Sequence, residues 1–426
     1  MEIKDVFKEL IRNFQDRKLS EFTDRSMQLP MNTGKIVSLT GVRRSGKTYI
    51  LYQSIAGLYK QGIKPEQIIF INFEDERLPD NPETFDMVLQ AYRELFPDRK
   101  LSECYFFFDE IQNIDKWEKF VRRLNDQESK NIFITGSNSK LLGREIATEL
   151  RGRAINYELY PLGFKEYLAF RDIAIDLYVP SQKAKIIAAF DDFLFRGGFP
   201  ETIGFSEHIH RKVIQEYFNT MLFRDIVERY NVADVNVLKF FVKKIIASVT
   251  SPLSVNKIYN EIRSNKYETG KNVLYDYLRY VEEAYMTVVI NKYDHSIIKQ
   301  ENSNKKVYAI DNSFLPVLDY YVSSNKGKLL ENFAALEFIK SGKKIFYFKQ
   351  IKECDFIVES NTGFLPIQVA FSIKDTTTRK RELDGLMAAC KYLDVNKGMI
   401  ISYGEPENFK YQHIDVQVVE AYKYFL

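Results

Sequence analysis

The chain has 426 residues, of which 45% are hydrophobic and 28% charged. It is too long for one hydrophobic core, so its length predicts two to four domains, and its composition excludes a largely disordered chain. Lys and Arg total 61 against 58 Asp and Glu, and a net charge of +3 gives little long-range attraction for nucleic acid, so any such binding must depend on a local surface.

Cysteine and histidine are too scarce and too scattered for a disulfide framework or a zinc site. Cys104, Cys354 and Cys390 form no C-x-x-C pair, and only four histidines accompany them. The amino-terminal segment is charged throughout, and no window holds the roughly 18 apolar residues that a membrane span needs. We therefore expect a cytoplasmic protein without a membrane partner.

Short apolar runs alternate with amphipathic stretches in the first 160 residues. The apolar runs are typical of strands buried on both faces, and they cover 35–40, 67–73, 104–109 and 131–136. Helical patterns cover 47–59, 82–95 and 115–124. This alternation predicts an α/β domain, with a parallel sheet covered by helices on both sides.

A glycine-rich segment follows the first of these strands. Residues 41–48, Gly-Val-Arg-Arg-Ser-Gly-Lys-Thr, fit the phosphate-loop (Walker A) pattern G-x-x-x-x-G-K-[ST] between a predicted strand and a predicted helix. Its glycines let main-chain N–H groups face one anion, and the helix N-terminus adds partial positive charge. The segment predicts an ATP site, with a chance glycine turn as the alternative. The residues expected to bind the nucleotide are Gly41, Val42, Arg43, Arg44, Ser45, Gly46, Lys47, Thr48 and Tyr49.

Two carboxylates end the strand at 104–109. We expect Asp109 to hold Mg²⁺ together with the Thr48 hydroxyl, as in a Walker B strand. Glu110 would act as the catalytic base that orients the attacking water, while Lys47 would contact the β- and γ-phosphates. The alternative is that the acidic pair is a solvated strand end.

Polar and basic residues after the fourth strand supply further candidates. Ser137 or Asn138 would sense the γ-phosphate, although both are also common turn residues. Arg153 would stabilise transition-state charge, in cis or from a neighbouring subunit of an oligomer. A surface salt bridge is the alternative role for Arg153.

The rest of the chain predicts three further domains. Three amphipathic helices near 236–249, 254–263 and 270–284 precede two β-type runs, which is the element order of a winged helix-turn-helix. The predicted organisation is a P-loop ATPase domain at 1–160, a helical lid or connector at 161–232, a winged-helix domain at 233–326 and a terminal domain at 327–426.

Several separated segments carry a family resemblance. They are GVRRSGKT (41–48), INFEDERL (71–78), FFFDEIQNIDKWEKFVRRL (106–124), ITGSNSKLL (134–142), LRGR (150–153), YPLGFKEYL (160–168) and FRGGFPE (195–201). In this order they resemble the bacterial and archaeal AAA-type ATPases of the AAA_14 group, whose carboxyl half is the DUF4143 domain. The resemblance implies an ATPase sheet of the additional-strand type, a winged helix and a C-terminal restriction-endonuclease-like α/β domain. It implies no particular biological role.

Endonuclease-like folds gather an acidic helix residue, an Asp and a Glu-x-Lys around Mg²⁺. Glu331, Asp355 and Gln368 fall at the first three matching positions. Gln368 removes one charge from such a site, and Ala370 cannot stabilise a hydroxide, so we expect the domain to be inactive as a nuclease.

The second helix of a helix-turn-helix enters the DNA major groove. The side chains that could meet DNA or RNA here are Lys257, Lys271, Asn272, Tyr275, Arg279, Lys305 and Lys306. Glu282 and Glu283 close the same helix, and winged helices also bind proteins, so a protein partner is the alternative.

Three hypotheses for function follow. The first is a Mg-ATP-binding AAA-type ATPase that couples hydrolysis to a conformational change acting on nucleic acid or a protein partner. The second is a nucleotide-gated regulatory or scaffold switch, in defence or signalling, without motor activity. The third, an ATP-dependent nuclease, requires the terminal domain to tolerate Gln368 and Ala370.

Overall fold

A computed structural model describes residues 2–19, 22–137, 150–318, 326–361, 363–404 and 406–426. The chain divides into two compact units, Met1–Tyr160 and Pro161–Leu426. Within the described residues, no helix is long and apolar enough to cross a membrane.

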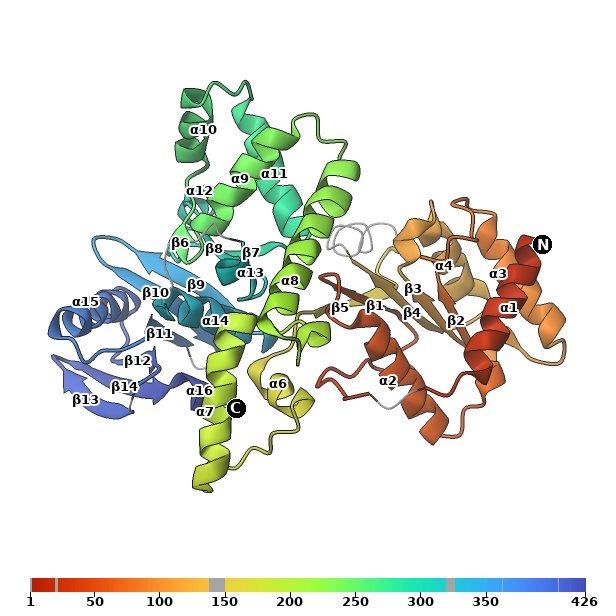
Figure 1. Ribbon diagram of the computed structural model, residues 1–426, viewed down its shortest axis with the longest axis horizontal. Helices are drawn as coiled ribbons and strands as arrows, with labels where there is room; N and C mark the ends of the chain where they lie inside the picture. The colour runs from red at the N-terminus through yellow and green to blue at the C-terminus, as the bar shows by residue number, and fades with distance from the viewer. Residues whose placement is uncertain (1, 20–21, 138–149, 319–325, 362, 405) are drawn as a thin grey trace. The chain divides into compact units, whose positions relative to one another are not determined.

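The first unit is built on a parallel five-stranded sheet (Figure 1). Its strands are β1 (Ile36–Gly41), β2 (Ile68–Asn72), β3 (Tyr105–Asp109), β4 (Asn131–Gly136) and β5 (Ala154–Leu159). The spatial order is β2-β3-β4-β1-β5, so β4 lies between the strand that enters the glycine-rich loop and the strand that carries the acidic pair. Because all five strands run in one direction, their carboxyl ends meet at one edge. The predicted parallel α/β sheet is confirmed.

Helices cover both faces of this sheet (Figure 1). Phe106 and Phe108 contribute to one hydrophobic core and Phe107 to another, as the alternation of side chains along a strand requires. The first core includes residues of α1 (Ile3–Asp16), α3 (Thr84–Leu95) and α4 (Trp117–Gln127). The second includes residues of α2 (Lys47–Lys60).

The sequence did not predict β5. Among the described residues this strand pairs with β1 alone, at an edge of the sheet, and Ile155 on it is exposed. With its solvated side chains, β5 lacks the nearly continuous apolar run from which the other four strands could be predicted.

The second unit begins with three helices, α6 (Phe164–Phe170), α7 (Pro180–Arg196) and α8 (Glu207–Leu222). Aromatic side chains of α6 and α7 share one core with α14 (Lys326–Lys340): Phe164 packs against Phe190, and Phe190 packs against Phe333. These helices therefore pack within the second unit itself, while the domain boundaries expected inside it stay a prediction.

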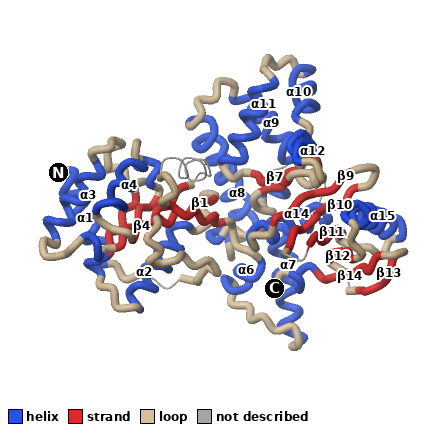
Figure 2. Tube along the Cα trace, turned by 180° about the vertical axis from the view of Figure 1, so that it is seen from behind, coloured by secondary structure: helices blue, strands red, loops and turns tan. Residues whose placement is uncertain are grey.

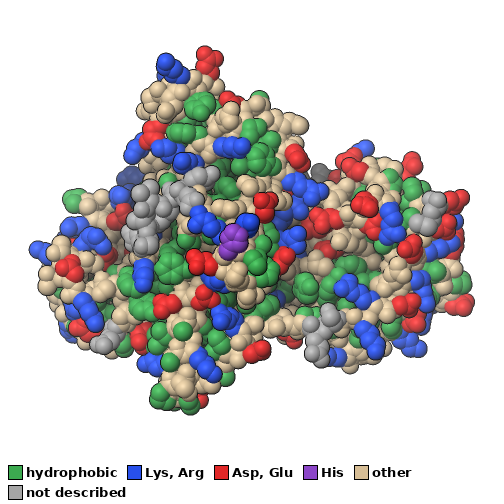
Figure 3. Space-filling model, in the orientation of Figure 1, with side chains coloured by type: hydrophobic (Ala, Val, Ile, Leu, Met, Phe, Trp, Pro, Cys, Tyr) green, Lys and Arg blue, Asp and Glu red, His purple; other side chains and the backbone are tan. Residues whose placement is uncertain are grey.

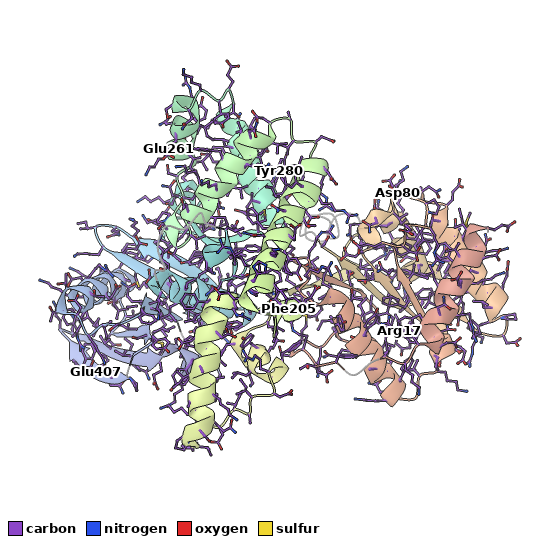
Figure 4. The ribbon with its side chains drawn as sticks, viewed as in Figure 1. Arg17, Asp80, Phe205, Glu261, Tyr280 and Glu407 are labelled. Atoms are coloured by element: carbon purple, nitrogen blue, oxygen red, sulfur yellow. The ribbon has the colours of Figure 1, made fainter. Side chains whose placement is uncertain are left out.

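Residues 235–309 form helices beside a small antiparallel sheet of order β6-β8-β7 (Figure 2). The elements are α9 (Val235–Ala247), β6 (Ser251–Pro252), α10 (Val255–Ser264), α11 (Lys271–Glu283), β7 (Thr287–Ile290), α12 (Ile297–Asn302) and β8 (Lys306–Ala309). Tyr280 on α11, labelled in Figure 4, stacks on Tyr230 with ring centroids 3.7 Å apart. The three helices and the strands β7 and β8 follow the expected order, with β6 and α12 in addition, and the identification as a winged helix-turn-helix stays a prediction.

The carboxyl-terminal part contains a six-stranded sheet of order β13-β14-β12-β11-β10-β9. Its strands are β9 (Lys344–Lys349), β10 (Glu353–Ser360), β11 (Gly363–Ala370), β12 (Lys397–Ser402), β13 (Glu407–Tyr411) and β14 (Ile414–Glu420). Side chains of α14 share a core with one face, and those of α15 (Thr376–Leu393) with the other. The short helices are α13 (Phe314–Val317) and α16 (Ala421–Tyr424). The endonuclease-like identity of this part also stays a prediction.

Candidate functional site

The glycine-rich loop connects β1 to α2 at the carboxyl edge of the first sheet. Gly41 has a φ of +152°, and a Cβ there would lie 2.1 Å from the carbonyl oxygen of Leu159 on β5. Gly46 precedes α2 with a φ of +96°, which favours glycine. The loop thus presents the first turn of a 14-residue helix, where unpaired N–H groups and the helix dipole attract an anion.

Lys47, the first residue of α2, is buried within the loop. Its Nζ donates hydrogen bonds to the carbonyl oxygens of Gly41, at 3.1 Å, and Val42, at 3.3 Å. The same Nζ lies 3.5 Å from Oε1 of Glu110. The ammonium group is therefore held between the loop and the acidic end of β3, where it can meet a bound phosphate.

Asp109 is held at the end of β3 by two hydroxyl groups. Thr48 Oγ1 donates to its Oδ2 at 2.7 Å, and Thr135 Oγ1 donates to its Oδ1 at 2.5 Å. Burial and the neighbouring Glu110 raise the pKa of Asp109 to about 6. A carboxylate beside a hydroxyl is an oxygen donor set suited to Mg²⁺, so these residues fit the predicted metal site.

Glu110 has a φ of +51°, an uncommon value for a residue other than glycine. Its N–H donates to Thr135 Oγ1 at 2.9 Å, and its Oε2 accepts from Gln112 Nε2 at 2.5 Å. Burial opposes its ionisation, but Lys47, Gln112 and Arg43 outweigh that effect and hold the pKa of Glu110 below its usual range. The carboxylate is therefore ionised at neutral pH, as a proton acceptor must be.

Ser137 follows β4 and lies at the same edge. Its Oγ is 3.5 Å from Gln112 Nε2, and the residue is buried. Two buried atoms nearby, Ser45 Oγ and Gln112 Oε1, have no hydrogen-bond partner among the described residues. Because buried polar atoms are normally paired, these two atoms favour a site built for a polar ligand. Asn138 lies outside the described residues.

The remaining predicted loop residues lie around this centre. Arg43 Nη1 pairs with Glu74 Oε1 at 3.3 Å, and Arg44 has a φ of +65°. Val42 is fully buried, whereas Tyr49 on α2 is 55% exposed. The loop therefore presents both buried and accessible side chains close to Lys47.

Sequence reasoning missed Thr135, Gln112 and Arg25. The Arg25 guanidinium is buried and donates to the carbonyl oxygens of Ser45, at 2.7 Å, and Tyr160, at 3.0 Å. It thereby joins the loop to the last residue of the first unit. No motif marks Arg25, because it lies in an irregular segment that meets the loop only after folding.

Arg153 is not brought to this centre. It immediately precedes β5, whose first residue, Ala154, pairs with Ile36 at the start of β1. That is the amino end of these strands, opposite to the glycine-rich loop. Its guanidinium forms two hydrogen bonds to the carboxylate of Asp126, at 2.8 and 3.1 Å. The predicted catalytic role of Arg153 in cis is wrong on this geometry, and the residue forms the salt bridge that was the alternative. A catalytic role of Arg153 at a neighbouring subunit stays a prediction.

The structure brings the endonuclease-like residues of the second unit together. Lys306 Nζ lies 2.8 Å from Glu331 Oε1 and 3.1 Å from Asp355 Oδ1. The Gln368 side chain forms hydrogen bonds with main-chain groups: its Oε1 accepts from Asp355 N at 2.8 Å, and its Nε2 donates to Glu353 O at 3.2 Å. Lys306 is 1% exposed, so the expectation that it meets nucleic acid is wrong.

The parallel sheet with its glycine-rich loop defines a P-loop NTPase-like protein. The AAA domain family AAA_14 matches residues 33–168, and two domains of unknown function, DUF8612 and DUF4143, match residues 187–324 and 326–424. The chain belongs to the AAA_14 family of AAA-type proteins with a carboxyl-terminal DUF4143 domain.

Relatives extend over nearly the whole chain. The uncharacterized protein MJ1544 of Methanocaldococcus jannaschii is 34% identical over 99% of this chain and 96% of its own length. An uncharacterized protein of Haemophilus influenzae is 30% identical over 84% of this chain and 86% of its own. Among solved structures, the Walker-type ATPase PABY2304 of Pyrococcus abyssi aligns with 74% of this chain and 95% of its own, at 15% identity and a TM-score of 0.42.

Proposed function

We propose that the first unit binds Mg-ATP at the glycine-rich loop and hydrolyses it. The observation that supports this most directly is the convergence of Lys47, the Thr48–Asp109 pair and Glu110 at one edge of the sheet. Loop N–H groups and Lys47 neutralise the phosphates, and Thr48 and Asp109 hold Mg²⁺, which supplies positive charge to the transferring phosphoryl group. Glu110 takes the proton of the attacking water, while Ser137 and Gln112 orient the polar groups around it.

Two substitutions test this proposal. Lys47→Ala should abolish ATP binding, measured by titration calorimetry, because it removes the cation that meets the phosphates. Lys60→Ala, at the exposed end of the same helix, is the matched control and should bind like wild type. Tight ATP binding by Lys47→Ala would refute the site.

Glu110→Gln tests the base. The variant should bind ATP as tightly as wild type but turn it over at least about 100-fold more slowly, since general-base catalysis contributes about 10²–10⁴-fold. Turnover equal to wild type would remove Glu110 from that role.

We further propose that hydrolysis drives a conformational change that acts on nucleic acid or on a protein partner. Lys271, Asn272 and Tyr275 on α11 and Lys257 on α10 are exposed, as a nucleic-acid surface requires. Arg279 is exposed too, but it pairs with Asp276 and Glu283. Figure 3 shows basic and acidic side chains interspersed on the visible face, so any nucleic-acid contact must be local.

The rate of ATP hydrolysis with and without nucleic acid separates the hypotheses. A nucleic-acid motor should be stimulated by double-stranded DNA, single-stranded DNA or structured RNA, and the double charge reversal Lys257→Glu/Lys271→Glu should abolish stimulation. Lys165→Glu, on α6, is the control for a reversal at an unrelated exposed site. Unchanged hydrolysis with every nucleic acid would leave a protein-directed ATPase or a nucleotide-gated regulatory switch.

A further inference from the structure

The second unit contains a buried ammonium group surrounded by three carboxylates, of which one is buried and two are half-buried. Lys306 begins β8, and its Nζ lies 2.8 Å from Glu331 Oε1 on α14 and 3.1 Å from both Glu353 Oε1 and Asp355 Oδ1 on β10. A lysine ammonium has three N–H donors, and here three carboxylate oxygens surround it. The three contributing elements carry labels in Figure 1.

The second oxygen atoms of Asp355 and Glu353 also have partners. Asp355 Oδ2 accepts from Val369 N at 3.0 Å, and Glu353 Oε2 pairs with Lys349 Nζ at 2.9 Å. Glu331 Oε1 accepts a second hydrogen bond, from the Tyr308 hydroxyl at 3.0 Å. Five of the six carboxylate oxygens are thus paired with groups of the chain itself, as buried charges require.

Electrostatics agree with this geometry. Burial opposes ionisation of Lys306, but Glu331, Tyr308, Asp355 and Glu353 outweigh it and hold its pKa well above the usual range. Burial and the neighbouring Asp355 raise the pKa of Glu331 to about 8. At neutral pH Glu331 is therefore protonated, and the positive charge of Lys306 faces the negative charges of Glu353 and Asp355.

Two observations distinguish this cluster from a metal site. Gln368, which stands where the endonuclease pattern has an acidic residue, uses its side-chain oxygen and nitrogen in hydrogen bonds with main-chain groups. No group of three or more His, Cys, Asp and Glu within the described residues could hold a metal ion. A cleft of about 560 Å³, lined by Glu353, Tyr347 and Lys349 among others, nevertheless gives solvent access to one edge of the cluster.

We propose that Lys306 is the resident cation of this centre. Its ammonium group occupies the position that a divalent metal takes in an endonuclease-like centre, and it fastens β8 to α14 and β10. The centre takes no divalent metal, and the carboxyl-terminal part serves binding or coupling without metal-dependent cleavage.

Thermal unfolding of the full chain tests the structural half of the proposal. Lys306→Met, which keeps the length of the side chain and removes the charge, should lower the Tm because the carboxylates lose their partner. Adding Glu353→Gln and Asp355→Asn to Lys306→Met should recover part of the loss, since no uncompensated charge is then buried. A Lys306→Met variant with the Tm of wild type would overturn the proposal, as would a triple variant that shows no recovery.

Mn²⁺ binding tests whether the centre takes a divalent metal. The nucleotide-free protein is titrated with Mn²⁺ and free ion is followed by electron paramagnetic resonance, with wild type compared with Glu331→Gln. Gln keeps the size of a protonated Glu and an oxygen that accepts from Tyr308 and Lys306, so this variant should fold. The two isotherms should coincide. One additional Mn²⁺ bound by wild type and lost in Glu331→Gln would show a true metal centre and refute the proposal.

Discussion

The hydroxyl of Thr135 offers the sharpest test of how the ATPase centre is held. It donates to Asp109 Oδ1 at 2.5 Å and accepts from Glu110 N at 2.9 Å, and the residue is fully buried. Thr135→Val keeps the shape of the side chain but leaves the Glu110 N–H without an acceptor. An unsatisfied buried donor costs about 1–3 kcal/mol, and the lost bond to a carboxylate adds about 1.5–3 kcal/mol. We expect a total loss of about 2.5–6 kcal/mol in the free energy of unfolding.

Activity should fall as well, because Thr135 also fixes the uncommon backbone conformation of Glu110. A base displaced from its position costs about tenfold in turnover for every 1.4 kcal/mol of lost transition-state stabilisation. Thr135→Ser is the matched control, since it keeps the hydroxyl and removes only a methyl group. Urea unfolding and steady-state ATP turnover give both readouts. Equal stability and equal turnover in the Val and Ser variants would refute the assigned role.

Three further predictions concern other parts of the chain. Gly41→Ala should fail to fold or to bind nucleotide, because its Cβ would meet the Leu159 carbonyl group. Gly57→Ala, where a Cβ would have nothing within 4 Å, should stabilise the folded protein by about 0.5–1 kcal/mol. Equal Tm values for the two variants would contradict this prediction. Arg25→Met should weaken ATP binding in calorimetry more than Arg25→Lys, since the loop loses its donor. Because the pKa of Glu331 is raised in the folded protein, this residue contributes fully to the free energy of unfolding at low pH. That contribution is lost as the pH rises from about 4.5 to 8. Glu331→Gln should therefore flatten the fall of Tm across that window, and parallel Tm curves for wild type and variant would refute it.

Much of the first unit could be predicted because local signals and tertiary structure agree there. Strands β1, β2, β3 and β4 are nearly continuous apolar runs, and the glycine-rich loop lies between a strand and a helix as its motif requires. The edge strand β5 has exposed side chains, so periodicity did not reveal it. The same applies to β13, which lies at the edge of the second sheet and is largely exposed.

The candidate site was predictable only where a motif carried it. Lys47, Thr48, Asp109 and Glu110 could be named from the sequence because phosphate and metal binding constrain residue type and spacing together. Arg25 could not, since its partners are main-chain carbonyl oxygens that fix no residue type at either end.

Lys306 shows a second reason why the sequence does not predict the environment of a side chain. A lysine beside a predicted wing is usually solvated, and only tertiary structure places it among three carboxylates.

The two acidic centres of the chain differ in how their carboxylates are held, and the difference bears on function. In the first unit Asp109 is held by neutral hydroxyls, and the ammonium of Lys47 also bonds loop carbonyls, so a metal and phosphates can replace these contacts. In the second unit the cation is a lysine on the chain itself, 1% exposed and surrounded by acids, which no diffusing ion can displace without exposing a buried charge. Exchangeable contacts suit turnover, whereas a tethered cation suits a fixed structure. We therefore expect the chemistry to belong to the first unit.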